Sequence, residues 1–592
     1  MRFVSLALGM VLSLIVVACS AQIPRGDQTP FVTPTFTPTR TTTPAPLPST
    51  PTVTPMPKPK VLRINLATRP DSLDPQKAFS SSEIAILQMA YEGLTRVDEK
   101  GNVQPGAADR WEFSADGKTL LFHLRAGLKR ADGTPITSKD FEYAFKRAVD
   151  PRVAAPSQSF MDDVRGAQEA YSVDPKSKPD DVEKLLSNVG VTAISDSSLA
   201  ITLNQPTGYF PTIVSTWIGM PTEKARVDKD LDAWWLKPEN QNGNGPFKII
   251  DIEDQVIKLV PNPNYWGGTS SIERIEFYWL ADNAALETYR QGGLDVMRVI
   301  PDDVTQVQSD PVMSKELFRA PSARVTYLGF NVKKAPFTDE NVRKAFSMAL
   351  DRDSFVRDVL NGLGRSFLTW IPPGMPGYDS TATVPAYDPQ NALRTLINAG
   401  YGTPDKTKVD CAKLGPVKLT YANTPRTQLL FQYIAGNLTR VFSCQVVLDP
   451  VEANALPIVI RDPKTTPQVF LIPWEEEYPH PQNWLFLQTC NGVYAQRIGY
   501  CNKEFDTALA AANEELDFAK SIDKYKAAQR IFVGDVAAAF LWNNDNAYLV
   551  KPYVQGLIEH ASTGDNAWVG QYGPVLNYTI DTAKVGVGYP DK

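Results

Sequence analysis

The chain has 592 residues, of which 43% are hydrophobic and 21% are charged, and its formal net charge is −6. It is far longer than the roughly 250–300 residues at which a single core stops growing, so we expect a soluble protein of two or more lobes. An acidic chain of mixed charge without basic clusters argues against nucleic acid as a partner.

The N-terminal residues are typical of an export signal. Arg2 precedes an apolar run over residues 3–18 that is too short to span a bilayer unaided. Segment 1–18 resembles a bacterial lipoprotein signal peptide, in which Cys19 would be lipidated and would attach the protein to the membrane. The alternative is an ordinary secretory signal with an incidental cysteine. Either interpretation predicts an extracytoplasmic protein, and no later apolar run reaches spanning length.

Residues 19–60 are rich in proline, threonine and serine and contain almost no large apolar side chains. Such a segment cannot bury enough surface to offset the entropy lost on folding. We therefore expect an extended tether between the lipid and a folded body. A glycosylated stalk is the alternative.

The folded body begins with alternating apolar and polar residues over 61–67, which predicts a half-buried strand. A helical pattern follows over 83–93, with Ser82 as the expected N-cap. Period-two alternation returns over 111–130 around a tight turn at 116–117, which predicts a hairpin.

Later helices have clear start and stop signals. Ser138 begins one, Thr338 caps another, and Asp388 with Pro389 begins a third that Gly400 ends. Strands alternate with helices of about ten to fifteen residues, and this alternation favours an α/β architecture.

Four cysteines remain if Cys19 carries lipid, and in an oxidising compartment they are expected to pair. Cys490 and Cys501 flank a short loop, which suggests a local disulfide; Cys411 and Cys444 would then form the second. The spacing does not fix the connectivity, and metal binding through thiolates is the weaker alternative.

Short motifs in a fixed order along the chain resemble the extracellular solute-binding proteins of the oligopeptide/dipeptide/nickel class, the substrate-binding lipoproteins of ABC importers. The resemblance covers essentially everything after the tether. The motifs are WEFSADG (111–117), FHLR (122–125), DGTP (132–135), GNGPFK (243–248), NPNYWGG (262–268), GGLD (292–295), FN (330–331), PFTD (336–339), VRKA (342–345), YDP (387–389), AGY (399–401) and YCNKEFD (500–506).

This resemblance implies a type II periplasmic-binding-protein fold, with two hinged lobes and a small subdomain on the first lobe. By analogy, the chain crosses the hinge twice. The expected ranges are 61–95, 190–318 and 525–592 for lobe I, 96–189 for the subdomain and 319–524 for lobe II.

The resemblance also implies a ligand site at residues 473–481. Peptide-binding members carry there an Asp that holds the ligand's amino group, and Glu477 occupies the matching position with one more methylene. Because adjacent residues of an extended chain point to opposite sides, Glu475 and Glu477 face the cleft while Glu476 does not, or the reverse. A solvated acidic loop is the alternative. The expected ligand residues here are Trp474, Glu475, Glu477 and Tyr478.

Two further loops match cleft segments of the family. The loop of Phe79, Ser80 and Ser81 matches the one that pairs with the ligand backbone, with a capped helix start as the alternative. Asn244 and Gly245 lie in a loop that lines the cleft in relatives.

Tryptophans are candidates for side-chain pockets in the cleft. Trp217, Trp474 and Trp484 either form such pockets or belong to the core.

Metal chelates and oligosaccharides are alternative ligands of the same class. Of the three histidines, only His480 lies in the proposed cleft, beside the glutamates, whereas His123 and His560 lie elsewhere. This is a poor transition-metal set, so we expect neither a metal nor a cofactor.

The sequence contains no nucleophile elbow, zinc-protease motif or phosphate-binding loop, so we expect no enzyme. A secreted peptide or glycan hydrolase is the alternative from a different class, and a ligand-sensing partner of a receptor is a third. We expect a monomer that captures oligopeptides in an interlobe cleft and docks on ABC permease subunits.

Overall fold

The computed structural model describes residues 58–66, 68–558, 575–586 and 588–590. The expected signal peptide, Cys19, the tether up to residue 57 and His560 lie outside the described residues. Within these ranges, every helix is too short or too polar to cross a membrane.

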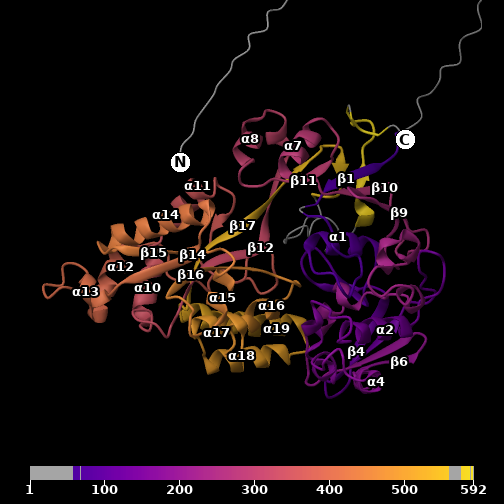
Figure 1. Ribbon diagram of the computed structural model, residues 1–592, viewed down its shortest axis with the longest axis horizontal. Coiled ribbons are helices and arrows are strands. Elements are labelled where there is room, and N and C mark those ends of the chain that lie inside the picture. The colour runs from indigo at the N-terminus through magenta and orange to yellow at the C-terminus, as the bar shows by residue number, and fades with distance from the viewer. Residues whose placement is uncertain (1–57, 67, 559–574, 587, 591–592) are drawn as a thin grey trace, which may run out of the picture. The chain divides into compact units, whose positions relative to one another are not determined.

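The largest sheet of the described residues has eleven strands (Figure 1). Parallel pairs join β1 to β10 and β11, and β14 to β15 and β16. The path is β15 (Val446–Val451), β14 (Val417–Ala422), β16 (Val469–Glu475), β12 (Leu317–Phe330), β17 (Ala538–Val550), β11 (Val296–Arg298), β1 (Val61–Asn65), β10 (Arg274–Tyr278), β9 (Val256–Pro261) and β8 (Phe247–Ile252), with β13 (Arg365–Ser366) on β17.

Two long strands connect the two ends of this sheet. β12 has 14 residues and β17 has 13, and they pair antiparallel from Leu317 with Leu549 to Gly329 with Ala538. β12 continues to β16 on one side, whereas β17 continues to β11 on the other. Since both strands run between the two expected lobes, they are the segments in which a hinge would lie.

A separate sheet of four strands has the order β4 (Ala108–Phe113), β5 (Thr119–Leu124), β7 (Ser198–Thr202) and β6 (Val191–Ser195). The predicted hairpin around residues 116–117 is its β4–β5 pair. Because β6 and β7 pair with this hairpin, the small sheet extends past residue 189, where we expected the subdomain to end. Two short two-stranded sheets, β2 (Thr95–Val97) with β3 (Val103–Pro105) and β18 (Val554–Gln555) with β19 (Thr579–Ile580), complete the described strands.

Helices cover the sheets. Those of the first half are α1 (Ser81–Ala90), α2 (Ser138–Ala148), α3 (Ala167–Tyr171), α4 (Pro179–Asn188), α5 (Phe210–Ile213), α6 (Lys224–Val227), α7 (Asp282–Arg290), α8 (Val304–Ser309) and α9 (Met313–Glu316). Those of the second half are α10 (Glu340–Met348), α11 (Arg352–Val359), α12 (Pro389–Leu396), α13 (Cys411–Leu414), α14 (Pro425–Phe442), α15 (Leu456–Arg461), α16 (Pro481–Leu485), α17 (Val493–Ile498), α18 (Lys503–Asn513) and α19 (Phe518–Gly534).

Alternating residues of β12 face two different cores, as the period of a strand requires. Leu328 and Phe330 belong to a core built with α10 and α14. Val325 and Tyr327 belong to a second core, which includes Trp484 of α16 and residues of α19. The sheet is therefore buried on both faces here, and the loop after β16 leaves it next to α16.

Two helices have an N-cap residue that differs from the predicted one. The N-cap of α1 is Ser80 and not Ser82: its hydroxyl accepts from the Glu83 N–H at 3.3 Å, and the Glu83 carboxylate accepts from the Ser80 N–H at 2.8 Å. This reciprocal capping box satisfies two N–H groups at once. The N-cap of α10 is Asp339 and not Thr338, because the Asp339 carboxylate accepts from the Asn341 N–H at 2.8 Å.

Both expected cysteine pairs form disulfides. Cys411 pairs with Cys444 across α13 and α14, and Cys490 pairs with Cys501 around α17. The start of α12 also follows its prediction, with Asp388 as N-cap and Pro389 in the first turn.

Candidate functional site

A cavity of about 190 Å³ lies where the loop after β16 meets two segments of the first half of the chain. The rings of Phe160 and Tyr478 lie 5.3 Å apart, edge to face, across this meeting point. Its lining residues are Ser159, Phe160, Asp162, Asp163, Tyr209, Ile213, Glu477, Tyr478, Gln482, Asn483 and Phe486.

The loop after β16 is held by its own backbone. The Glu476 N–H donates to the Ala323 carbonyl at 3.0 Å, and the Glu477 N–H donates to Asn483 Oδ1 at 2.9 Å. His480 then caps α16, since its Nδ1 accepts from the Gln482 N–H at 3.2 Å. These bonds fix the direction in which Glu477 leaves the strand.

The three successive glutamates lie in three different environments. Glu475 lies 3.9 Å from the Arg324 guanidinium. Glu476 accepts from Trp484 Nε1 at 3.2 Å, its other oxygen is buried without a partner among the described residues, and burial raises the pKa of Glu476 to about 8. Glu477 lines the cavity. The alternation expected from the sequence thus separates Glu477 from Glu476.

Two aspartates, Asp162 and Asp163, line the cavity together with Glu477. The Tyr171 hydroxyl donates to Asp162, and the Tyr209 hydroxyl donates to Asp163. Burial raises the pKa of Asp163, with the neighbouring Asp162 charge adding to it, and burial also raises the pKa of Glu477. Across the described residues, no Lys, Arg or His nitrogen lies within 4.0 Å of these three carboxylates.

Tyr478 and Trp217 enclose Phe160 from opposite segments. Phe160 lies 5.5 Å from Trp217, and the Trp217 indole N–H donates to the Ala78 carbonyl at 3.1 Å. Because Trp217 is buried and its polar group is satisfied, it supports the cavity wall through Phe160 and does not itself line the cavity. The Tyr478 hydroxyl donates to Gln482.

The other two tryptophans differ from one another. Trp484 is fully buried, with its ring 5.2 Å from that of Trp370, so it belongs to the core. Trp474 packs edge-on against Tyr494 at 5.6 Å, and its buried indole N–H lacks a hydrogen-bond partner among the described residues. A buried donor without a partner marks a place that water or a ligand can satisfy.

Phe79, Ser80 and Ser81 have the geometry of a capped helix start. The Glu83 carboxylate accepts from the N–H groups of Phe79 and Ser80 at 2.7 and 2.8 Å, so these groups are already occupied. The Phe79 side chain is 68% exposed. A contact between this loop and a ligand backbone stays a prediction.

Asn244 and Gly245 connect their loop to the end of α1. The Asn244 side chain accepts from the Glu92 N–H at 3.0 Å and donates to the Glu92 carbonyl at 2.9 Å. A Cβ at Gly245 would lie 2.5 Å from the Ala90 carbonyl carbon, so only glycine fits there. Both residues therefore shape the loop, and neither lines the cavity described above.

The two histidines of the described residues, His480 and His123, lie in different places. His480 is buried, and burial lowers its pKa to about 3. His123 lies on β5, 3.4 Å from Glu112. Among the described residues, no group of three or more His, Cys, Asp or Glu side chains is placed to hold a metal ion.

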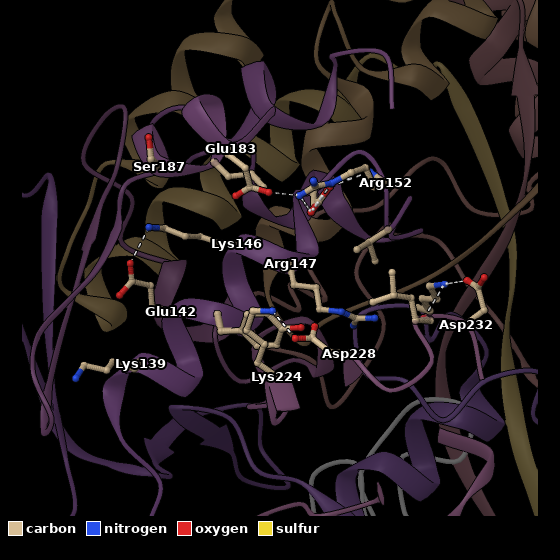
Figure 2. A pocket seen from close by; sticks show the side chains of 16 residues that line it. Lys139, Glu142, Lys146, Arg147, Arg152, Glu183, Ser187, Lys224, Asp228 and Asp232 are labelled. Carbon is tan, nitrogen blue, oxygen red and sulfur yellow. Dashed lines mark hydrogen bonds and ion pairs between the residues drawn. The ribbon is translucent and has the colours of Figure 1, made fainter. Parts of the chain in front are cut away.

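A larger cavity, of about 760 Å³, lies beside α2 and α4 and is lined by many charged groups (Figure 2). Every cation that lines it has a carboxylate partner within 4.0 Å. The pairs are Lys77 with Asp232, Lys139 with Asp196, Lys146 with Glu142, Arg147 with Asp74, Arg152 with Asp150 and Glu183, and Lys224 with Asp228. Because its charges balance internally, this cavity presents no unpaired charge to a ligand.

Several cavity residues were missed in the sequence: Phe160, Asp162, Asp163, Tyr209, Gln482 and Asn483. Phe160, Asp162, Asp163 and Tyr209 come from segments that are distant in the chain and carry no motif, whereas Gln482 and Asn483 directly follow the stretch 473–481. The adjacent acids at 162 and 163 were the one visible signal, and alone they are indistinguishable from a solvated turn.

The chain matches the family described as bacterial extracellular solute-binding proteins, family 5 Middle, over residues 102–495. It is 28% identical over 512 residues to the dipeptide-binding protein DppE of Bacillus subtilis, covering 85% of this chain and 90% of that protein. It is 29% identical over 507 residues to the periplasmic murein peptide-binding protein MppA of Escherichia coli, covering 83% and 89%.

Solved structures of peptide-binding proteins are similar to this chain in fold. The unliganded open form of MppA superposes with a TM-score of 0.75 at 25% identity, over 89% of this chain and 99% of that one. OppA of Haemophilus influenzae in complex with RPPGFSPFR gives a TM-score of 0.61 at 25% identity, over 88% and 99%. The expected α/β fold of the type II periplasmic binding proteins is thereby confirmed.

Proposed function

Because the chain belongs to the bacterial extracellular solute-binding proteins of family 5, we propose that it captures oligopeptides between its two lobes and delivers them to the permease subunits of an ABC importer. Its similarity to DppE and MppA, which are named as peptide-binding proteins, supports a peptide ligand. The observation that carries the proposal is the acidic cavity at Glu477.

Glu477 binds the α-ammonium group of the peptide in this proposal. A partly buried ammonium group needs a carboxylate partner, and a charge-assisted hydrogen bond is among the strongest available. Glu477 has no cation within 4.0 Å among the described residues, so it is available for this role. Glu477 carries one methylene more than the aspartate expected at this position, and its backbone N–H donates to Asn483 Oδ1 at 2.9 Å.

Closure of the lobes buries the peptide. The cavity already joins Phe160 and Tyr209 of the first half to Tyr478 and Gln482 of the second, and Gln482 Nε2 donates to Tyr209 Oη at 3.3 Å. A ligand shifts the equilibrium toward the closed state only through contacts that it makes better there. A peptide whose amine reaches Glu477 while its chain contacts the other lobe meets this requirement.

The remaining features of the proposal concern location. The protein is exported by segment 1–18, anchored through lipid on Cys19 and carried on the tether of residues 19–60 as a monomer. It binds its ligand without altering it. Its partners are the peptide, the permease subunits and, through the lipid, the membrane.

The test replaces Glu477 by Ala and compares tripeptides with a free or an acetylated N-terminus by isothermal titration calorimetry. A hydrogen bond to a charged group contributes about 1.5–3 kcal/mol, so the variant should bind the free peptide roughly 10- to 100-fold more weakly. Binding of the acetylated peptide, which lacks the charge, should be nearly unchanged.

Glu452 is an exposed residue outside the cavity, and Glu452→Ala serves as the matched control with unchanged affinity for both peptides. An equal loss of affinity for the free and the acetylated peptide in Glu477→Ala would contradict the role of Glu477.

A further inference from the structure

The cavity at Glu477 carries an unbalanced charge. Asp162, Asp163 and Glu477 line it, and none of its lining residues is a lysine, an arginine or a histidine. The cavity beside α2 and α4 shows the opposite arrangement, with every lining cation paired. One α-ammonium group neutralises only one of three carboxylates, so the excess negative charge calls for a second cation.

The walls of the cavity are suited to an organic cation. Four aromatic side chains line it, and aromatic faces attract ammonium and guanidinium groups. These rings belong to Phe160, Tyr209, Tyr478 and Phe486. The described residues offer no cluster placed to hold a metal ion, so a metal would find no adequate set of ligands here.

Asn483 gives an independent indication of a ligand. This residue is fully buried and lines the cavity, and its Nδ2 has no hydrogen-bond partner among the described residues. Its Oδ1 accepts from the Glu477 N–H at 2.9 Å, which fixes the other end of the amide as the donor. The carboxylates that line the cavity suit a cation, and the buried Nδ2 donor suits a carbonyl oxygen. The first residue of a peptide carries both groups close together.

We propose that this cavity binds the first residue of peptides that begin with lysine or arginine. The α-ammonium group binds Glu477, the side-chain cation binds Asp162 and Asp163, and the Asn483 Nδ2 donates to the first carbonyl oxygen. This inference rests on the proposed function and names its preferred substrate class. The cavity volume of about 190 Å³ suits one side chain and leaves the rest of the peptide outside.

The position of the acids gives this preference a role in closure. Asp162 and Asp163 precede α3, whereas Glu477 follows β16 on the other side of the cavity. A residue with two positive charges bridges the two sides, so it binds the closed arrangement better than the open one.

The test measures the affinity of the full chain for Lys-Ala-Ala and for norleucine-Ala-Ala, which has a side chain of similar length without charge. The wild-type protein should bind the lysine peptide at least about tenfold more tightly. Asp162→Asn with Asp163→Asn should remove most of this preference and leave the affinity for the norleucine peptide within about twofold. Asp254→Asn, which neutralises a fully exposed carboxylate, should keep the preference.

The comparison of the lysine and norleucine peptides on the wild-type protein needs no variant. It therefore tests the inference even if the double variant does not fold. Equal affinity for the two peptides would overturn the inference while the proposed function stands. Failure of both peptides, and of a broad peptide mixture, to bind would overturn the proposed function and this inference with it.

Discussion

Glu476 is the half-buried neighbour of the proposed ligand residue, and the burial of its carboxyl group gives a quantitative prediction. Its pKa rises from the ordinary 4.5 to about 8 because its carboxyl group is buried. Trp484 Nε1 at 3.2 Å is its hydrogen-bond donor, and its second oxygen is unpartnered among the described residues. The carboxyl group is therefore most stable in its protonated form.

This shift makes the stability of the protein depend on pH. Since the folded-state pKa lies above the unfolded-state value, the folded protein holds a proton that the unfolded chain releases, and stability falls as pH rises from 4.5 to about 8. Each pKa unit corresponds to about 1.4 kcal/mol, so the loss is roughly 3 kcal/mol at pH 7. Below pH 4.5 the contribution is constant.

Glu476→Gln removes the titration and keeps an oxygen that accepts from the Trp484 indole. We expect the variant to be more stable than the wild type by about 3 kcal/mol near pH 7 and nearly equal to it at about pH 4. Urea unfolding followed by tryptophan fluorescence across this pH range measures the difference. Glu452→Gln, at an exposed position, is the control and should follow the wild-type pH dependence.

Parallel stability curves for the wild type and Glu476→Gln over the whole pH range would refute the reasoning. Such a result would mean that the carboxyl group is solvated in the folded protein.

Three further outcomes are expected. Replacing Cys411 and Cys444 by Ala opens a loop with a sequence separation of 33 and should lower the free energy of unfolding by about 4 kcal/mol in denaturant titrations; no change would contradict a formed disulfide. Arg147→Ala leaves the buried Asp74 without its 2.5 Å ion pair and should cost about 3–5 kcal/mol, whereas the adjacent Lys146→Ala, which breaks only a helix-surface pair, should cost about 0.5 kcal/mol or less. Small-angle scattering should show a smaller radius of gyration when a broad peptide mixture is added; identical profiles would contradict lobe closure.

Much of the fold was predictable because its signals are local. The strand at β1, the β4–β5 hairpin and the start of α12 depend on alternation, a turn and a cap that neighbouring residues supply. The shift of the α1 cap from Ser82 to Ser80 was also visible, since Ser80 and Glu83 have capping-box spacing. The end of the small sheet was not predictable, because β6 and β7 join the sheet through pairing between residues that are distant in the sequence.

The candidate site was predictable only in part. Glu477 was found because a stretch of chain resembles the ligand loop of related proteins, and no periodicity indicated it. Asp162 and Asp163 were not found, because they reach the cavity through the packing of Phe160 against Tyr478, more than 300 residues away in the sequence. A cavity assembled from segments that are distant in the sequence leaves no local pattern in any one of them.

The central claim is that the protein captures a peptide and releases it unaltered. Native mass spectrometry of the protein incubated with a defined tripeptide, followed by denaturation and analysis of the released ligand, tests this claim most directly. We expect a complex with the mass of the protein plus one intact tripeptide, and recovery of the same tripeptide. Recovery of shorter fragments, or no complex with any peptide of a broad mixture, would contradict the claim.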